Sequence, residues 1–376
     1  MTGRFETGSG VVKAASACEY ESPPIQGHRP RLGFIGPMVG RNPGYVTSQG
    51  EVLAALLRQT GYQVIAASGH KNRYVRLVDI AGTMVRQRRR VDLLALEVYS
   101  GRSFVVEDVA SSLGALHRKP IIMILHGGNL PEFMARFPRW SRRVLRRAAA
   151  LVAPSEYLAR AVASWGFPAR VIPNVVEVAR YPYRYRPNVR PRLFWMRSFH
   201  AIYNPMLAIR VLARLRFRFS DATLVMAGQD KGLERQVQRF ADKLGVSEHV
   251  RFPGFLDHAG KTREGEAADI FLNTTNVDNM PVAVVEACAM GLPVVSTAAG
   301  GVPDLLTDGE TGLLVRPDDE EAVALAVETL VNDAELAARL SASGRRLAEA
   351  SSWERVRPQW EQLFAEVMAR RGGERK

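Results

Sequence analysis

The chain has 376 residues, of which 47% are hydrophobic and 24% charged, and a formal net charge of +13. This length suits two domains of about 150 residues each, and the composition excludes a disordered or fibrous protein. Apolar runs fall short of the roughly 18 residues that a membrane-spanning helix needs, and two cysteines, Cys18 and Cys288, are too few for a disulfide framework or a metal cluster. We therefore expect a globular, cytoplasmic protein.

The net positive charge lies entirely in the first half of the chain. Residues 1–180 hold 25 Lys and Arg against 12 Asp and Glu, whereas residues 181–376 hold 26 of each kind. This asymmetry indicates an anionic partner for the first half, such as a membrane surface or a phosphorylated acceptor, or else a general preference for arginine. Nucleic acid is a poor candidate, because no recognition motif accompanies the basic residues.

The first half alternates short apolar strands with helical segments, which is typical of a parallel sheet covered by helices on both faces. Residues 1–29 contain Gly, Ser, Glu and Pro without apolar periodicity, and we expect a flexible tail there. The first domain is expected over residues 30–178. Strands are predicted at residues 31–36, 62–68, 91–98, 120–126 and 150–155, with helices at 48–59 and 106–117.

Candidate site residues follow these strands, because ligands of open α/β sheets bind beyond the carboxyl ends of the strands. The loop after the first strand carries Gly40 and Gly44. It lacks the G-x-G-x-x-G pattern of dinucleotide-binding proteins, and a simple turn explains it as well as close approach of a ligand does. His126 ends the fourth strand beside two glycines, which favours exposure to a cleft over burial. Tyr99 and Arg102 follow the third strand and would line the same edge.

The segment Arg136–Leu151 combines a basic and an apolar helical face. One interpretation is a helix that lies on anionic lipid, and the other is a core-packed helix with a solvated basic face. The basic face consists of Arg139, Arg142, Arg143, Arg146 and Arg147.

A change of pattern separates the two halves. Residues 177–192 contain three prolines and break both periodicities, so we predict an interdomain linker at 179–192. The strand and helix alternation then resumes, and a second domain is expected over residues 193–352. A last helix, from about Trp353 to Arg371, repeats apolar residues at helical spacing.

Residues 273–301 combine two carboxylates with a predicted helix start. Asp278 precedes a helix predicted from Pro281 to about Met290, and Glu286 lies within its apolar sequence. A helix N-terminus offers unpaired amides to phosphate or hydroxyl oxygens, and a carboxylate in an apolar run can accept two ribose hydroxyls. An N-cap aspartate and a solvent-facing glutamate are the alternative. The amides expected to face the cleft are those of Asn279, Met280 and Val282.

This segment resembles the Glu-x7-Glu signature of the retaining, GT-B-fold glycosyltransferases of family four, with Asp278 in the first acidic place. The sequence from Gly300 to Leu330 continues the family's pattern, and weaker similarity extends from Arg31 to the last helix. The resemblance implies an α/β fold of two Rossmann-like parallel-sheet domains that face a cleft. It also implies that the C-terminal helix, residues 353–376, returns to the first domain.

The resemblance implies transfer of a sugar from a nucleotide diphosphate sugar to a glycan or lipid-linked acceptor with retention of configuration. No metal or other cofactor is expected. His126, Asp278 and Arg197 are the implied catalytic residues, Arg197 acting on the diphosphate. The implied donor-binding residues are Glu286, Asn279, Met280, Pro281, Val282, Asn204, Gly228, Gln229, Phe255, Gly40 and Gly44, and the acceptor-side residues are Tyr99, Arg102, Gly127 and Gly128.

One position departs from the family pattern. Asn204 stands where the family has a lysine that, together with Arg197, neutralises the diphosphate. Loss of one cation weakens stabilisation of the leaving group, unless another residue such as His200 replaces it. A protein that binds the donor with weak or no transfer, or a nucleotide-sugar epimerase of the same fold, therefore remains an alternative.

Overall fold

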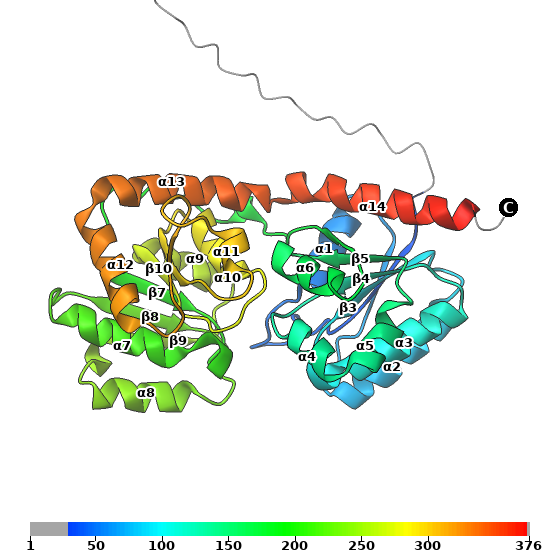
Figure 1. Ribbon diagram of the computed structural model, residues 1–376, viewed down its shortest axis with the longest axis horizontal. Coiled ribbons are helices and arrows are strands. Elements are labelled where there is room, and N and C mark those ends of the chain that lie inside the picture. Colours follow the sequence, from blue (N-terminus) through cyan, green and yellow to red (C-terminus); the bar gives the residue numbers. More distant parts are fainter. Residues whose placement is uncertain (1–28, 374–376) are drawn as a thin grey trace, which may run out of the picture.

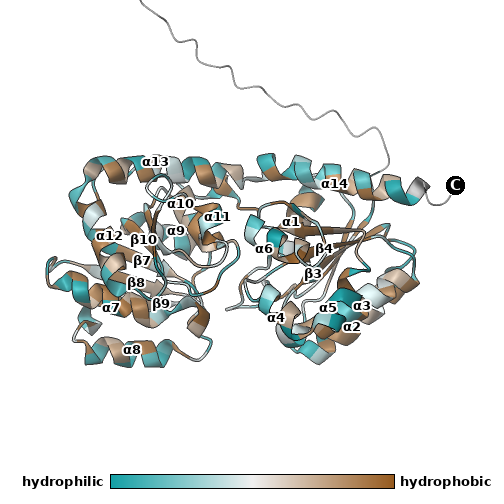
Figure 2. Cartoon of the chain, viewed as in Figure 1, coloured by the Kyte–Doolittle hydropathy of each residue, from teal (hydrophilic) through white to brown (hydrophobic). Residues whose placement is uncertain are grey.

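The computed structural model describes residues 29–373, and it comprises two α/β lobes side by side (Figure 1). The predicted tail, except Arg29, lies outside the described residues. Figure 2 shows hydrophobic strands at the centre of the lobes and hydrophilic surfaces on several outer helices, α5 most clearly. Each lobe therefore has its own apolar core.

The first lobe is built on a six-stranded parallel sheet of order β2-β1-β3-β4-β5-β6. Its central strands are apolar, apart from Glu97 of β3, because helices cover both faces. The strands are β1 (Leu32–Ile35), β2 (Val64–Ala67), β3 (Leu93–Val98), β4 (Ile121–Leu125), β5 (Ala150–Ala153) and β6 (Ala169–Val171). The helices are α1 (Gln49–Gln59), α2 (Arg73–Gln87), α3 (Phe104–Leu116), α4 (Leu130–Arg136), α5 (Pro138–Leu145) and α6 (Glu156–Ala163).

The second lobe repeats this design in a parallel sheet of order β12-β11-β10-β7-β8-β9. The strands are β7 (Arg192–Met196), β8 (Thr223–Ala227), β9 (Val250–Gly254), β10 (Ile270–Asn273), β11 (Val294–Thr297) and β12 (Leu313–Val315). The helices are α7 (Pro205–Arg216), α8 (Glu234–Lys243), α9 (His258–Ala267), α10 (Val282–Ala289), α11 (Val302–Leu305), α12 (Glu320–Asn332) and α13 (Ala334–Ala350).

The last helix, α14 (Trp353–Gly373), returns to the first lobe as predicted. With α13 it runs along one edge of both lobes (Figure 1). Its Val356, Trp360 and Phe364 are buried in the same core as Leu32 and Leu57 of β1 and α1. The chain therefore connects the two lobes twice, which confirms the GT-B architecture.

The segment predicted as a linker packs closely on the second lobe. Arg186 is 1% exposed and donates hydrogen bonds to the carbonyl oxygens of Gly265 and Ala268. Burial lowers the pKa of its guanidinium to about 9. Arg184 pairs with the buried Asp269 at 2.7 Å. These contacts fix the second lobe relative to the crossover between the lobes.

The predicted helix at residues 136–151 is wrong in extent. The backbone of Phe137 departs from helical geometry between α4 and α5, α5 ends at Leu145, and β5 begins at Ala150. Two of the basic residues, Arg143 and Arg147, pair with Asp108 of α3. This part of the predicted basic face is therefore used to attach α5 to α3.

Candidate active site

Two loops of the second lobe meet where its strand order reverses. β7 and β10 are neighbours, and the chain proceeds from them toward opposite edges of the sheet. The crevice beyond the carboxyl ends of such strands is the usual ligand site of an open α/β sheet. Arg197 directly follows β7 and Asp278 follows β10, so the topology brings these two predicted residues together.

Arg197 forms an ion pair with Asp278 through Nη2 and Oδ2. The two side chains are 8% and 13% exposed. The guanidinium also lies 4.1 Å from the centre of the Tyr203 ring, which is a cation–π contact. Its Nε is buried without a hydrogen-bond partner in the described part of the chain. The crevice thus contains a desolvated cation with unused hydrogen-bonding capacity.

Glycines allow other backbone segments to approach the Asp278 loop closely. A Cβ atom at Gly300 or Gly301 would collide with the carbonyl of Asp278 or Asn279. From the first lobe, a Cβ atom at Gly128 would lie 2.9 Å from the Asp278 carbonyl oxygen. The loop that follows His126 therefore packs directly against the Asp278 loop, and the two lobes meet here.

The helix after Asp278 begins one residue later than predicted. Pro281 is its N-cap, with an extended backbone, and α10 starts at Val282. The Asn279 amide is not free, because it donates to Oδ1 of Asp278 at 2.9 Å. Within residues 29–373, the amides of Met280 and Val282 have no such partner. They are the amides that remain available at this helix N-terminus.

Asn279 and Met280 also contact the first lobe. The Asn279 side chain accepts a hydrogen bond from the hydroxyl of Ser155, and the Met280 carbonyl accepts one from Asn174 at 3.3 Å. Two residues predicted to bind donor therefore also join the lobes.

Glu286 lies in α10, 7% exposed, and both of its oxygens are engaged. Lys261 of α9 donates to Oε1 and Oε2 at 2.8 and 3.0 Å, and the Tyr181 hydroxyl donates to Oε1 at 2.6 Å. Burial and the Glu286 charge raise the pKa of Tyr181, so its hydroxyl remains a donor. Sequence reasoning missed Lys261 and Tyr181. The only signal for Lys261 is its position in the first turn of a helix that follows a candidate pocket loop.

Asn204 does not take the place of the family's lysine. It adopts a left-handed conformation, φ +44°, which asparagine tolerates better than lysine does. Its amide donates to Asp318 at 3.0 Å and to Asn276 at 3.4 Å. His200 uses Nδ1 to accept the Ile202 amide. The side chains of Asn204 and His200 are thus both engaged in hydrogen bonds within the second lobe.

The loop after β8 lies against the loop after β7. The Phe199 amide donates to the Gln229 carbonyl at 2.9 Å, and the Gly228 amide donates to the Gly254 carbonyl at 2.9 Å. Gly228 has φ +151°, and a Cβ atom there would collide with the Arg197 carbonyl. Gly228 and Gln229 are therefore close to Arg197 in space.

In the first lobe, His126 follows β4 and is 7% exposed, so the prediction that its side chain is exposed rather than buried is wrong. Tyr99 stacks on its ring at 4.9 Å between centres. Glu97 of β3, which is 1% exposed, places Oε1 3.5 Å from Nε2 of His126. Burial lowers the pKa of His126 to about 4 and raises that of Glu97 to about 7. Sequence reasoning missed Glu97, although a charged residue in a buried strand is a signal that it overlooked.

A cavity of about 520 Å³ opens between the lobes. The first lobe contributes the predicted Gly40 and Gly44, and the second contributes Phe255, which is 37% exposed. Arg41 and Arg263 face this cavity from the two sides. Arg102 lies on the exposed surface of the turn after β3. The cavity therefore lies where a cleft between the carboxyl ends of the two sheets was predicted.

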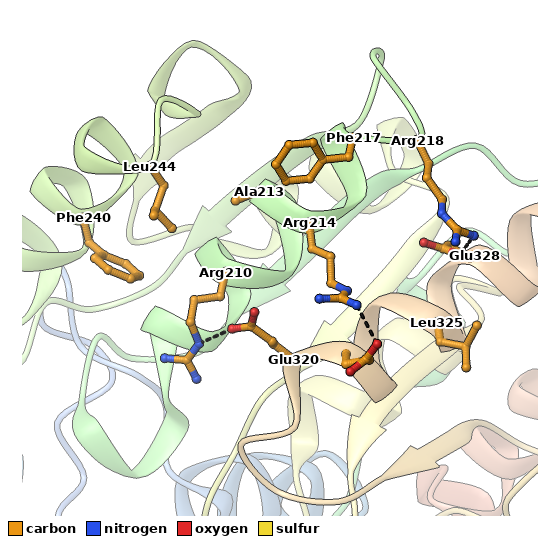
Figure 3. Close-up of a pocket in the computed structure, with 11 residues that line it drawn as sticks. Arg210, Ala213, Arg214, Phe217, Arg218, Phe240, Leu244, Glu320, Leu325 and Glu328 are labelled. Atoms are coloured by element: carbon orange, nitrogen blue, oxygen red, sulfur yellow. Dashed lines mark hydrogen bonds and ion pairs between the residues drawn. The ribbon is translucent and has the colours of Figure 1, made fainter.

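A second hollow, of about 480 Å³, lies on the outer face of the second lobe between α7, α8 and α12 (Figure 3). Arg210 and Arg214 of α7, and Arg218 just after its end, pair with acidic side chains of α12. Because these charges neutralise each other and none of the predicted site residues lines this hollow, the candidate active site is the interlobe cleft.

Comparisons with known proteins agree with this architecture. A model of "Glycosyl transferases group 1" matches residues 188–347, and one of "Glycosyltransferase Family 4" matches residues 103–180. The sucrose-phosphate synthase of Thermosynechococcus elongatus has a similar structure, with a TM-score of 0.77 at 16% identity over 91% of this chain and 100% of that one. HepE of Anabaena in complex with UDP-glucose gives a TM-score of 0.68 at 17% identity, over 91% of this chain and 100% of that one. The fold is that of the GT-B glycosyltransferases.

Curated relatives are similar over part of their length. A GDP-mannose-dependent alpha-(1-6)-phosphatidylinositol monomannoside mannosyltransferase of Mycolicibacterium smegmatis is 32% identical over 186 residues, 48% of each chain. A glycogen synthase of Mycobacterium tuberculosis is 29% identical over 215 residues, 55% of this chain and 50% of its own. The matches span about half the length of these relatives. Over residues 103–180 and 188–347 the chain is thus similar to glycosyltransferases, and its fold is GT-B.

Proposed function

We propose that the protein transfers a sugar from a nucleotide diphosphate sugar to a glycan or lipid-linked acceptor, with retention of configuration. Arg197 would bind the diphosphate, and Asp278 with the Met280 and Val282 amides would bind the sugar. Glu286 would bind the ribose, exchanging part of its contact with Lys261 for hydroxyl groups. Transfer would depend on positioning and leaving-group stabilisation, and no metal is expected.

The observation that carries this proposal is the convergence of Arg197 and Asp278 at the strand-order reversal of the second sheet. A cation and a carboxylate at this place suit a diphosphate and the sugar attached to it. The Gly128 contact supports the proposal because it brings the first lobe, with His126, to the same loop.

The environment of Asn204 favours one alternative, a protein that binds the donor without transferring its sugar. Its amide is held by Asp318 and Asn276, and it supplies no charge. Leaving-group stabilisation would then fall to Arg197 and the helix amides alone, which reduces the electrostatic contribution to catalysis.

A two-part experiment separates these functions. Thermal shift with GDP-mannose, UDP-glucose and the corresponding diphosphates should identify a ligand that raises the unfolding temperature, because binding to the folded state stabilises it. A transfer and hydrolysis assay with that donor should then show turnover, and Arg197→Ala should lose it. Binding without turnover under sensitive conditions would favour the alternative, and absence of any binding would contradict both functions.

We further propose that the acceptor side of the first lobe associates with an anionic membrane surface. Arg139, Arg142 and Arg146 of the α5 region are exposed, and no ion pair engages them among the described residues. No helix in residues 29–373 is long and apolar enough to cross a bilayer. The surface charge therefore supports attraction to the membrane surface.

A further inference from the structure

Glu97 is a carboxyl group buried in the centre of the first sheet, directly beside the candidate active site. It lies on β3, where it is paired in register with Ile124 of β4. His126 is two residues beyond Ile124, and residues two apart in a strand point to the same face. The topology therefore places Glu97 and His126 side by side, and Glu97 Oε1 lies 3.5 Å from His126 Nε2.

The residues around Glu97 donate hydrogen bonds to its carboxyl group and leave space for it. The Gly50 amide, in the first turn of α1, donates to Oε1 at 2.8 Å, and the Ser48 hydroxyl donates to Oε2 at 3.2 Å. A Cβ atom at Gly36 or Gly50 would collide with this carboxyl group. The N-terminus of α1 stabilises the charged form, whereas burial disfavours it. These opposed effects leave both protonation states of Glu97 accessible.

The neutral imidazole of His126 can carry its ring proton on either Nδ1 or Nε2. Burial holds the ring in the neutral form, with its pKa lowered to about 4. Nε2 is buried and has no hydrogen bond to any described residue, and Tyr99 fixes the ring plane by stacking. In a neutral histidine one nitrogen donates and the other accepts, and the partner of one nitrogen decides the role of the other.

We infer that Glu97 is a positioning residue that selects the tautomer of His126 and thereby decides whether its Nδ1 offers an acceptor or a donor to a hydroxyl group in the cleft. With Glu97 ionised, Nε2–H donates to the carboxylate and Nδ1 accepts. With Glu97 protonated, its O–H donates to Nε2 and Nδ1 carries the ring proton. The pair takes up one proton from solvent in this change, and the ring stays neutral throughout.

Other ionisable groups around the pair come from three helices and from Tyr99, which follows β3. Glu51 of α1 adds negative charge near Glu97. Glu107 of α3 titrates in the same pH range, because burial raises its pKa to about 8, and Arg76 of α2 lowers that pKa only in part. The Tyr99 hydroxyl is 3.4 Å from Glu97 Oε1. Because burial raises the pKa of Glu97 to about 7, the change of tautomer is expected near neutral pH.

The test is a titration of the full chain labelled with 15N-histidine, between pH 5.5 and 8.5, a range of about 1.5 units around the expected midpoint. The His126 ring nitrogens are followed by NMR and assigned with His126→Asn. The expected result is protonation at Nδ1 below the midpoint and at Nε2 above it. A single tautomer across the range would overturn the inference. This measurement needs neither a ligand nor an altered Glu97, so poor folding of a variant does not affect it.

Two matched variants extend the test. Glu97→Gln should abolish the pH dependence of the His126 tautomer. Glu107→Gln should retain it, because Glu107 is equally buried and binds the Tyr99 amide at 3.0 Å without contacting His126. Equal effects of the two variants would contradict a specific role of Glu97.

The effect of the His126 tautomer on a ligand in the cleft rests on the proposed function. With a donor that the protein turns over, Glu97→Gln should lower kcat by about 10-fold to 100-fold, the range for groups that orient a metal-bound histidine. It should also remove the limb of the pH profile near neutrality. Absence of turnover in the unaltered protein would reject the proposed function, while the NMR titration would still decide the tautomer inference. An unchanged pH profile in an active Glu97→Gln enzyme would overturn the inference.

Discussion

Arg197 and Asp278 neutralise each other within the candidate active site. The pair is largely removed from solvent, so each charge depends on the other for compensation. A nucleoside diphosphate that binds Arg197 must therefore compete with the Asp278 carboxylate, which also accepts the Asn279 amide. This competition makes the effects of Asp278 on diphosphate binding and on sugar transfer opposite in sign.

We predict that Asp278→Asn binds a free nucleoside diphosphate more tightly and transfers sugar more slowly. A hydrogen bond to a charged group is worth about 1.5–3 kcal/mol, so the gain in affinity should be about tenfold or more. Isothermal titration calorimetry with UDP and GDP measures it. Glu321→Gln, which breaks an ion pair with Arg214 on the outer face, is the control. Weaker diphosphate binding by Asp278→Asn would show that Asp278 positions Arg197 rather than competing for it.

The residues at the strand ends could be predicted from the sequence, but their partners could not. Arg197, His126 and Asp278 each follow a recognisable apolar strand, and parallel strands bring their carboxyl ends to one edge. Glu286, in contrast, binds Tyr181, which is 105 residues away in the sequence, and Lys261, which is 25 residues away. Such pairings depend on side-chain packing between elements, for which a single sequence carries no periodic signal.

At the scale of elements, the half-buried Asp108 determines which basic residues of the α5 region remain exposed. Asp108 accepts hydrogen bonds from Trp140 at 2.8 Å and from Arg147 at 2.7 Å, and it also binds Arg143. These contacts attach α5 to α3 and leave Arg139, Arg142 and Arg146 as the exposed cations. Arg142 in addition lies over the Trp165 ring.

We predict that the unaltered protein floats with vesicles that contain an anionic lipid and not with neutral vesicles. Replacing Arg139, Arg142 and Arg146 together by Gln should abolish this preference, since each basic residue near an anionic surface contributes about 1 kcal/mol. The matched control replaces Arg235, Arg239 and Lys243, three exposed cations of α8 in the second lobe. Equal loss in both variants would indicate a general charge effect, and no preference in the unaltered protein would reject the membrane proposal.

At the scale of the whole molecule, two lobes could be predicted from the chain length, the strand and helix alternation in both halves and the break in pattern at residues 177–192. The return of the last helix to the first lobe was implied by the family resemblance. The short edge strand β6 and the interlobe contacts were not predicted. β6 is three residues long and only partly buried, so it lacks an apolar pattern. Contacts between the lobes involve polar side chains of loops, whose positions depend on both folded domains.

One of these contacts joins α6 of the first lobe to α11 of the second. The Asp304 carboxylate accepts the Tyr157 amide at the N-terminus of α6 and pairs with Arg160 at 2.9 Å. The ion pair with Arg160 is exposed and contributes little. A carboxylate at a helix N-terminus contributes about 1 kcal/mol, because it neutralises unpaired amides and the partial positive charge there. Asp304 should therefore favour the closed arrangement of the lobes.

We predict that Asp304→Ala shifts the protein toward an open cleft. A loss of about 1 kcal/mol lowers the ratio of closed to open molecules about fivefold, and the apparent affinity for a donor that bridges the lobes falls with the closed fraction. Small-angle X-ray scattering should show a larger radius of gyration without donor, and saturating donor should restore the compact form. Glu321→Ala, which breaks an exposed ion pair within the second lobe, should scatter like the unaltered protein. Superimposable curves for Asp304→Ala and the unaltered protein would mean that Ser155, Asn279 and the Met280 carbonyl suffice to hold the lobes together.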